Sequence, residues 1–104
     1  MINSAIARLT SVKIEASLNE IFDIAKSTSA VKRGEIYGGD SLKILFKGGP
    51  APTYDTFVFI HKTGTGYEIE PNARDAKLGI DSVFFKSPKD FLKTLRSTYP
   101  KIKV

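Results

Sequence analysis

The sequence contains no cysteine, and its only histidine is His61. Without cysteine there can be no disulfides, thiolate metal sites or cysteine nucleophiles, and this composition fits an intracellular, cytoplasmic setting. A single histidine excludes a metal site built from several imidazoles and leaves any histidine acid–base role to one residue. We therefore expect a protein that uses no metal and no cofactor.

Long apolar runs are missing as well. The longest uninterrupted run in the body of the chain is 57–60, far short of the roughly 20 residues that a membrane span needs. At the start of the chain, Arg8 and Lys13 interrupt the apolar residues, and no charged region precedes an apolar stretch of signal-peptide length. We expect a soluble protein without a signal peptide and without membrane contact.

Catalytic and nucleotide-binding signatures are also absent. There is no nucleophile-elbow pattern, no G-x-x-x-x-G-K-[ST] and no G-x-G-x-x-G. The glycine pair at Gly64 and Gly66 lies inside an expected hairpin instead of opening a helix, where backbone N–H groups could bind a phosphate. These observations predict that the protein is not an enzyme.

Acidic residues are scarce in one segment, the last nineteen residues, where Asp90 is the only carboxylate. The same segment carries six basic residues: Lys86, Lys89, Lys93, Arg96, Lys101 and Lys103. Residues 1–85 balance ten basic against ten acidic side chains, so the net charge of +5 comes from residues 86–104 alone. A local positive surface suggests an acidic partner, most commonly a phosphate backbone.

What the chain does contain is enough to build one core. Its 104 residues include 41% hydrophobic residues, with seven Phe and four Tyr, which is ordinary for a soluble globular protein. We expect a single domain over 1–104, in which residues 100–104 form a basic C-terminal tail.

The first helix is expected at about 18–29. Ser17 and Glu20 match a capping box, in which the serine oxygen accepts from an early backbone N–H and the glutamate reaches back. Apolar residues then recur with helical spacing. Those on the predicted inner face are Leu18, Ile21, Phe22 and Ala25, with Ile24 at its edge.

The second helix is expected near 88–98. Ser87 is placed to cap it, Pro88 occupies the first helical position, and Asp90 brings a carboxylate to the positive end of the helix dipole. Its apolar stripe consists of Phe91, Leu92, Leu95 and Tyr99. Pro100 ends it.

Between the helices the hydrophobic period changes to two, which indicates strands. We expect strands at 41–47, 55–62, 66–70 and 81–86, a short strand at 35–37, a hairpin turn at 63–66 and a loop at 71–79. The last strand, with Val83, Phe84 and Phe85, is expected to be mostly buried. Residues 2–15 suit a short helix at their start, but the alternation over 10–15 favours a strand there.

The expected fold class is α+β: an antiparallel, four- to five-stranded meander sheet with an N-terminal and a C-terminal helix. In the strand at 55–62, Phe57 and Phe59 point one way and Val58 and Ile60 the other. One helix on each face of the sheet would cover both sides of this strand. Two helices on the same face would leave an apolar face for a second subunit. The sequence does not choose between these arrangements.

Five residues between the two expected helices are candidates for catalysis or metal binding. His61 shares a strand face with two phenylalanines, and we interpret it as a histidine hydrogen-bonded locally; catalysis would need a serine or threonine nucleophile beside it. The carboxylates Glu68, Glu70, Asp75 and Asp81 could hold Mg²⁺ or act as an acid–base pair. We favour a solvated hairpin edge for them, where charge discourages pairing with other strands.

The basic segment remains the strongest functional signal. Lys89, Lys93 and Arg96 are spaced four and three apart and so form a stripe on the predicted helix, which Lys86, Lys101 and Lys103 extend. The same lysines would also complement the helix dipole and favour solubility. Because arginine is rare in this stretch, base-specific contacts are not expected.

We interpret the chain as a small, non-enzymatic binding or regulatory protein whose basic C-terminal helix and tail contact nucleic-acid phosphates without sequence preference. The alternative is a protein–protein interaction or inhibitor module, of the kind carried by phages and plasmids. It would act through an apolar sheet face or the loop from Gly48 to Tyr54, including as a homodimer.

Overall fold

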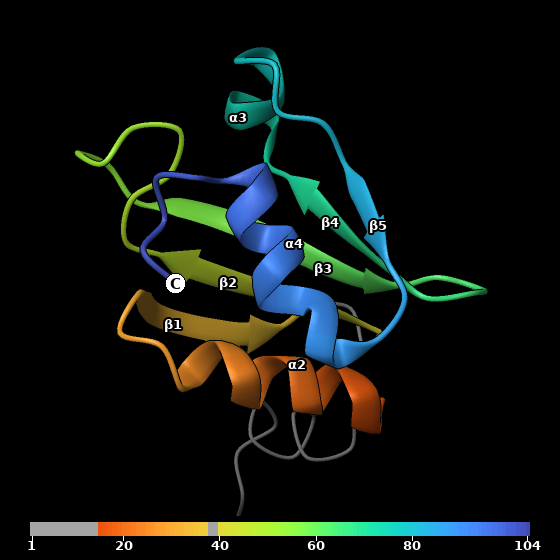
Figure 1. The fold of residues 1–104 in the computed structure, drawn as a ribbon. Coiled ribbons are helices and arrows are strands. Elements are labelled where there is room, and N and C mark those ends of the chain that lie inside the picture. Colours follow the sequence, from red (N-terminus) through yellow and green to blue (C-terminus); the bar gives the residue numbers. More distant parts are fainter. Residues whose placement is uncertain (1–14, 38–39) are drawn as a thin grey trace, which may run out of the picture.

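A computed structural model describes residues 15–37 and 40–104, so the expected strand at 10–15 lies outside the described residues except for Glu15. Five antiparallel strands form one sheet in the order β1-β2-β3-β4-β5 (Figure 1). The strands are β1 (Val31–Ile36), β2 (Ser41–Phe46), β3 (Thr56–Lys62), β4 (Tyr67–Pro71) and β5 (Val83–Phe85). The predicted meander is confirmed, and the expected short strand at 35–37 begins earlier, at Val31.

The hairpin between β3 and β4 has the expected turn. The N–H of Thr63 donates to the carbonyl of Gly66 at 2.8 Å, and the N–H of Gly66 donates back to Thr63 Oγ1 at 3.0 Å. A Cβ at position 66 would lie 2.6 Å from the carbonyl oxygen of Phe85, so the turn passes the end of β5 too closely for a side chain.

Both long helical segments lie on one face of the sheet (Figure 1). The first is α2 (Ala16–Lys26), which contacts β1, β2 and β3; the second is the 3₁₀ turn η1 (Pro88–Asp90) followed by α4 (Phe91–Thr98), which contacts β5 and α2. Of the two arrangements that the sequence allowed, the structure has both helices on the same side. The opposite side of the sheet, facing away from α2 and α4, is here called the open face.

The core lies between the helices and the sheet, and most of its side chains come from the predicted inward positions; Ile102, in the predicted tail, is an exception. The largest fully buried ones are Tyr99, Phe46, Phe91, Leu18, Ile21, Leu42, Ile44, Ile60, Ile69, Leu95, Ile102 and Val58. Burying this set removes apolar surface from water at roughly 25 cal/mol per Å², which is the main favourable contribution to folding. The period-two alternation in β2 and β3 is confirmed.

The first helix differs from the prediction at both ends. It begins before Ser17, because the carbonyl of Glu15 already accepts from the N–H of Asn19 at 3.0 Å, so Ser17 is not the cap. It ends at Lys26. There the hydroxyls of Ser27 and Thr28 donate to carbonyls of the last turn, at 2.6 and 2.8 Å, and stop the helix short of residue 29.

The C-terminal helix is confirmed over Pro88–Thr98, with its first turn in 3₁₀ geometry. Pro88 occupies the first helical position as expected. Ser87 sits at the cap position, but its hydroxyl donates to the Asp90 carboxylate at 3.2 Å and not to a helix N–H.

A third helix, α3 (Ala73–Lys77), lies within the stretch 71–79 that the sequence predicts as a loop. The side-chain oxygen of Asn72 caps it by accepting from the N–H of Asp75 at 2.9 Å. None of the helices in residues 15–37 and 40–104 is both long and apolar enough to span a membrane.

Two further segments differ from expectation. Phe84 is 69% exposed on the open face, so β5 is not mostly buried; Phe85 is buried in the core, and Val83 is partly buried against it. The C-terminal tail is packed in place, because Ile102 is 1% exposed and Val104 packs against the core.

Candidate functional site

The six basic residues of the C-terminal segment are all exposed: Lys86, Lys89, Lys93, Arg96, Lys101 and Lys103. Along α4, Lys93 and Arg96 are three residues apart and therefore lie on the same side of the helix, opposite the buried Phe91 and Leu95. Lys89 precedes them in the 3₁₀ turn. The segment thus presents its cations to solvent while its apolar stripe anchors it.

No carboxylate within residues 15–37 and 40–104 pairs with any of these six cations. The ion pairs of that part of the chain use other partners: Lys26–Asp23, Lys32–Asp55, Lys43–Glu35, His61–Glu70 and Arg74–Asp75. All Asp and Glu residues of the sequence fall in the described ranges. The positive charge of the C-terminal segment is therefore uncompensated by local pairing, in contrast to Lys32, whose hydrogen bond to Asp55 lowers the pKa of that carboxyl.

The tail brings in a further lysine that the sequence did not single out. Lys101 and Lys103 line one surface hollow together with Lys47, which follows β2. The loop after β2 approaches the tail closely: Gly48 has a φ of 80°, and a Cβ there would lie 3.1 Å from the carbonyl oxygen of Lys101. Three cations from two distant parts of the chain therefore share this hollow.

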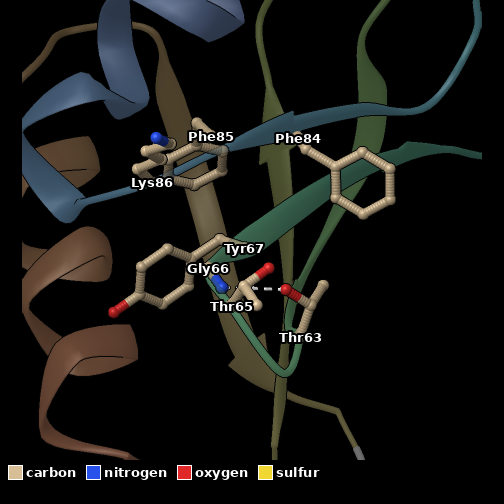
Figure 2. A pocket seen from close by; sticks show the side chains of 7 residues that line it. All are labelled: Thr63, Thr65, Gly66, Tyr67, Phe84, Phe85 and Lys86. Carbon is tan, nitrogen blue, oxygen red and sulfur yellow. Dashed lines mark hydrogen bonds between the residues drawn. The ribbon is translucent and has the colours of Figure 1, made fainter.

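Lys86 lies apart from that hollow. It lines another one, beside the β3–β4 turn, with Thr63 and Thr65 (Figure 2). In Figure 2 the ring of Tyr67 lies on the core side of the hairpin and the ring of Phe84 on the other side. The structure thus distributes the six predicted residues along a path from Lys86 through α4 to the tail and does not gather them in one pocket.

A second group of candidate side chains, aromatic and charged, lies on the open face. Its aromatic residues are Tyr37, Phe57, Phe59 and Phe84, joined by Leu45. Cations lie over these rings: Lys43 Nζ is 4.4 Å from the centroid of Phe57, and the guanidinium of Arg33 is 5.6 Å from it. Apolar and charged groups are therefore interleaved on a surface that neither α2 nor α4 covers.

His61 belongs to a hydrogen-bonded chain on the open face. Its Nδ1 lies 2.5 Å from Ser41 Oγ and its Nε2 lies 2.6 Å from Glu70 Oε1. Because a carboxylate only accepts, Nε2 carries the proton towards Glu70, and in the neutral ring Ser41 donates to Nδ1. A serine hydrogen-bonded to a histidine, which is in turn hydrogen-bonded to a carboxylate, is an arrangement that can activate a serine nucleophile.

The low exposure of Ser41 argues against catalysis by these three residues. Ser41 is only 5% exposed, so a substrate carbonyl could not approach its Oγ without rearrangement of the strand. The arrangement instead satisfies a buried hydroxyl and ties β2, β3 and β4 together. The interpretation of His61 as locally hydrogen-bonded is confirmed.

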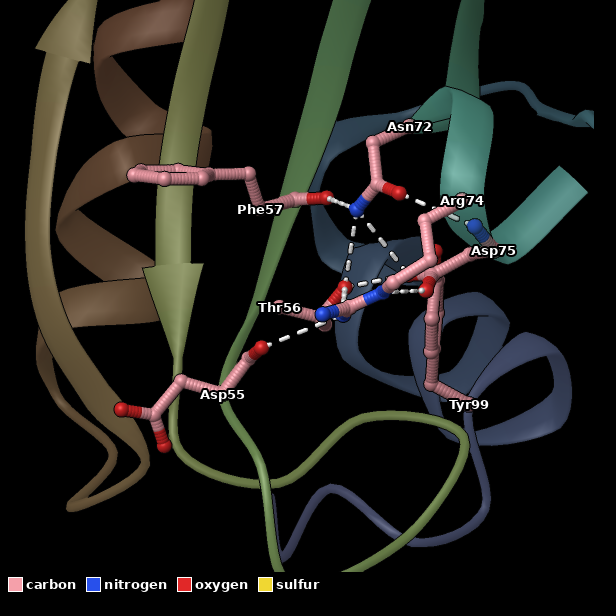
Figure 3. A network of polar contacts seen from close by, with 7 residues as sticks. All are labelled: Asp55, Thr56, Phe57, Asn72, Arg74, Asp75 and Tyr99. Atoms are coloured by element: carbon pink, nitrogen blue, oxygen red, sulfur yellow. Dashed lines mark hydrogen bonds and ion pairs between the residues drawn. The ribbon is translucent and has the colours of Figure 1, made fainter.

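A buried polar network surrounds Asp75, which is 0% exposed (Figure 3). Its carboxylate accepts from Tyr99 Oη at 2.9 Å, from Asn72 Nδ2 at 3.1 Å, from Arg74 Nε at 3.1 Å and from the Thr56 hydroxyl. Burial, and then the contact with Asp75, raise the pKa of Tyr99 well above its ordinary value. This network joins α3, β3 and the end of α4.

The four candidate metal-binding carboxylates do not converge. Glu68 and Glu70 lie on the open face, Asp81 is exposed in the connection to β5, and Asp75 is committed to the buried network, so it is not part of a solvated edge. Within the described ranges, no three histidine or acidic side chains come together in a way that could hold a metal ion.

Comparison of the chain with protein-family models, with curated proteins and with solved structures found no match, so its function must be argued from the residues themselves.

Proposed function

We propose that this protein is a non-enzymatic binding module that contacts nucleic-acid phosphates through the basic path along α4 and the tail. The observation that carries the proposal is the absence of any carboxylate partner, within the described residues, for six exposed cations. Unpaired cations keep their full electrostatic attraction for a polyanion, whereas a paired lysine must first give up its partner.

The path has the rigidity that such contacts require. Phe91, Leu95 and Tyr99 fix α4 on the core, and Ile102 anchors the tail, so Lys101 and Lys103 project from a packed backbone. Holding cations in place reduces the entropy lost on binding. We include Lys47 in this surface, because it shares a hollow with the two tail lysines.

The contacts should be independent of base sequence. Arg96 is the only arginine on the path, and its Nε donates to the carbonyl of Val104 at 3.3 Å. Specific base contacts are typically made by arginine, asparagine or glutamine pairs that reach base edges, and this surface presents lysines.

Salt dependence provides the test. Binding to a duplex and to a single-stranded oligonucleotide would be measured by fluorescence anisotropy over a salt series that begins at about 50 mM. If four or five cations neutralise phosphates, log K should fall against log salt with a slope between about −3 and −4.5. Substituting Lys89, Lys93 and Arg96 together by Gln should flatten the duplex slope by nearly three units.

The matched control removes the same charge elsewhere. Lys26→Gln, Lys32→Gln and Lys77→Gln together lower the net charge equally, but the first two lysines already pair with Asp23 and Asp55. This variant should keep most of the slope. Absence of binding to either oligonucleotide at the lowest salt, or equal losses in both triple variants, would refute the proposal.

A further inference from the structure

The strand register arranges the open face in rows that cross the sheet. One row contains Glu35, Lys43, Phe59 and Glu70, because β1–β2 pairs Glu35 with Lys43, β2–β3 pairs Lys43 with Phe59, and β3–β4 pairs Phe59 with Glu70. Directly opposed residues on one face have neighbouring side chains. The rings of β3 therefore lie at the centre of the sheet, with two strands on each side.

The two residues that flank Phe59 in its row carry opposite charges. On the β2 side the neighbouring side chain is Lys43, which pairs with Glu35 at 3.7 Å, and on the β4 side it is Glu70, which pairs with His61 at 2.6 Å. Both charged side chains remain accessible, with Glu70 51% exposed and Lys43 27% exposed. A lysine and a glutamate therefore flank the central aromatic residue at equal strand distances.

The next row has an aromatic residue at each end. His61 is its central residue, with Ser41 on one side and Glu68 on the other. Phe84 follows beyond Glu68 on β5, and Tyr37 follows beyond Ser41, where its N–H donates to the Ser41 carbonyl at 2.8 Å. Tyr37 and Phe84 are 52% and 69% exposed, two of the most exposed large hydrophobic residues described.

A two-fold axis parallel to β3 makes this face complementary to itself. Rotation by half a turn about such an axis exchanges the β1–β2 side with the β4–β5 side and leaves each row opposite its own copy. Lys43 then faces Glu70 of the second copy, and Phe59, against whose ring Tyr37 packs at a centroid distance of 5.2 Å, meets its equivalent. Two-fold interfaces require this kind of self-complementary surface, and aligned sheets pack in this way across side chains.

We propose that the open faces of two copies of this chain pack together in a symmetric homodimer, with Lys43–Glu70 ion pairs on both sides of a central phenylalanine contact. The exposed aromatic residues supply the apolar area, and the charge pattern sets the register. Helix α4, with Lys93 and Arg96, lies on the other face of each sheet (Figure 1), so these two cations stay outside this interface, whereas Lys86 shares a hollow with Phe84. The inference is therefore independent of nucleic-acid binding.

Charge reversal provides a test that a structural defect cannot imitate. Lys43→Glu alone would bring two carboxylates together at each pair position of the homodimer, and Glu70→Lys alone would bring two ammonium groups together there. Each single variant should therefore be a monomer. An equimolar mixture of the two should form a heterodimer, because the copy with two carboxylates then faces the copy with two ammonium groups at both pair positions. The double variant K43E/E70K, which restores an opposite-charge pair at both positions, should form a homodimer again.

Molar mass would be measured by light scattering and sedimentation at protein concentrations from micromolar to millimolar. We expect the wild type, the double variant and the equimolar mixture of the single variants to be dimers within this range, and each single variant measured alone to remain a monomer. Circular dichroism should show that each variant is folded. The matched control is Lys77→Glu, an equal charge reversal on α3, which should leave the dimer intact.

A wild type that is monomeric at millimolar concentration would overturn the proposal and assign the open face to a different occupant. A dimer that neither single variant weakens, or a folded double variant that stays monomeric, would show that the interface does not use this register.

Discussion

The two faces of the sheet are formed by the same strands but present different kinds of side chains. On the covered face, Leu42, Ile44 and Ile60 are completely buried against the helices, and their neighbours are apolar. On the open face, Lys43 and Phe59 alternate with them in the same two strands, so apolar rings and charges are mixed. The covered face completes its packing within one chain. The open face retains apolar area whose burial requires a partner.

Adjacent residues of β3 give the sharpest comparison between the faces. Ile60→Ala should lower the free energy of unfolding by about 2–5 kcal/mol, because it empties a fully buried site. Phe59→Ala should cost only about 1 kcal/mol in the monomer, because its ring is half-buried and less area is lost from the packed state. Urea denaturation at micromolar protein would measure both.

Protein concentration distinguishes folding from assembly in this experiment. If the dimer forms, the loss of unfolding free energy caused by Phe59→Ala should increase with protein concentration. The loss caused by Ile60→Ala should already be complete at low concentration, because it concerns packing within one chain. Equal costs for both variants at micromolar protein would contradict the assignment of the two faces.

The faces of β2 and β3 were predictable because side chains alternate strictly along a strand, so apolar residues at every second position identify the buried side. The assignment of Ser17 as a cap was wrong for a local reason: the capping-box pattern recurs inside helices, and the carbonyl of Glu15 starts the helix earlier. Helix α3 has only five residues, too few to show a period, and Asn72 with Asp75 was its only signal.

The sites depend on register and packing, which local patterns do not reveal. Ser41, His61 and Glu70 come from three strands, and nothing in the sequence places them side by side. Lys47 joins Lys101 only because the chain returns to the end of β2. The charge bias of the C-terminal segment was visible from composition, since solvent exposure of lysines needs no tertiary information.

Two tyrosines extend the comparison to pH. On the covered side, burial and the hydrogen bond to Asp75 raise the pKa of Tyr99 above its ordinary value of 10.0. The unfolded chain therefore ionises this residue at lower pH than the folded protein does. Stability from this source is fully present below about pH 10 and is lost as the pH rises further.

Phenylalanine at position 99 tests this expectation. Tyr99→Phe removes one hydrogen bond to a charged group and should lower stability at neutral pH by about 1.5–3 kcal/mol. The variant should also lose part of the alkaline destabilisation seen in the wild type, as measured by denaturant midpoints on both sides of pH 10. Tyr37→Phe, on the exposed side, is the matched control and should change neither quantity appreciably. An unchanged alkaline profile in Tyr99→Phe would contradict the assigned cause.

The smallest expected effect concerns Glu68, which lies on the open face. Its side chain lies opposite His61 and Phe84 in the register, and no ion pair within the described residues involves it. Glu68→Ala should therefore change the unfolding free energy of the monomer by no more than about 0.5 kcal/mol, as surface substitutions usually do. Glu70→Ala removes the hydrogen bond to His61 and should cost more. If Glu68→Ala were the more damaging of the two in urea denaturation at micromolar protein, the open face would depend on charge for its own folding as well as for a partner.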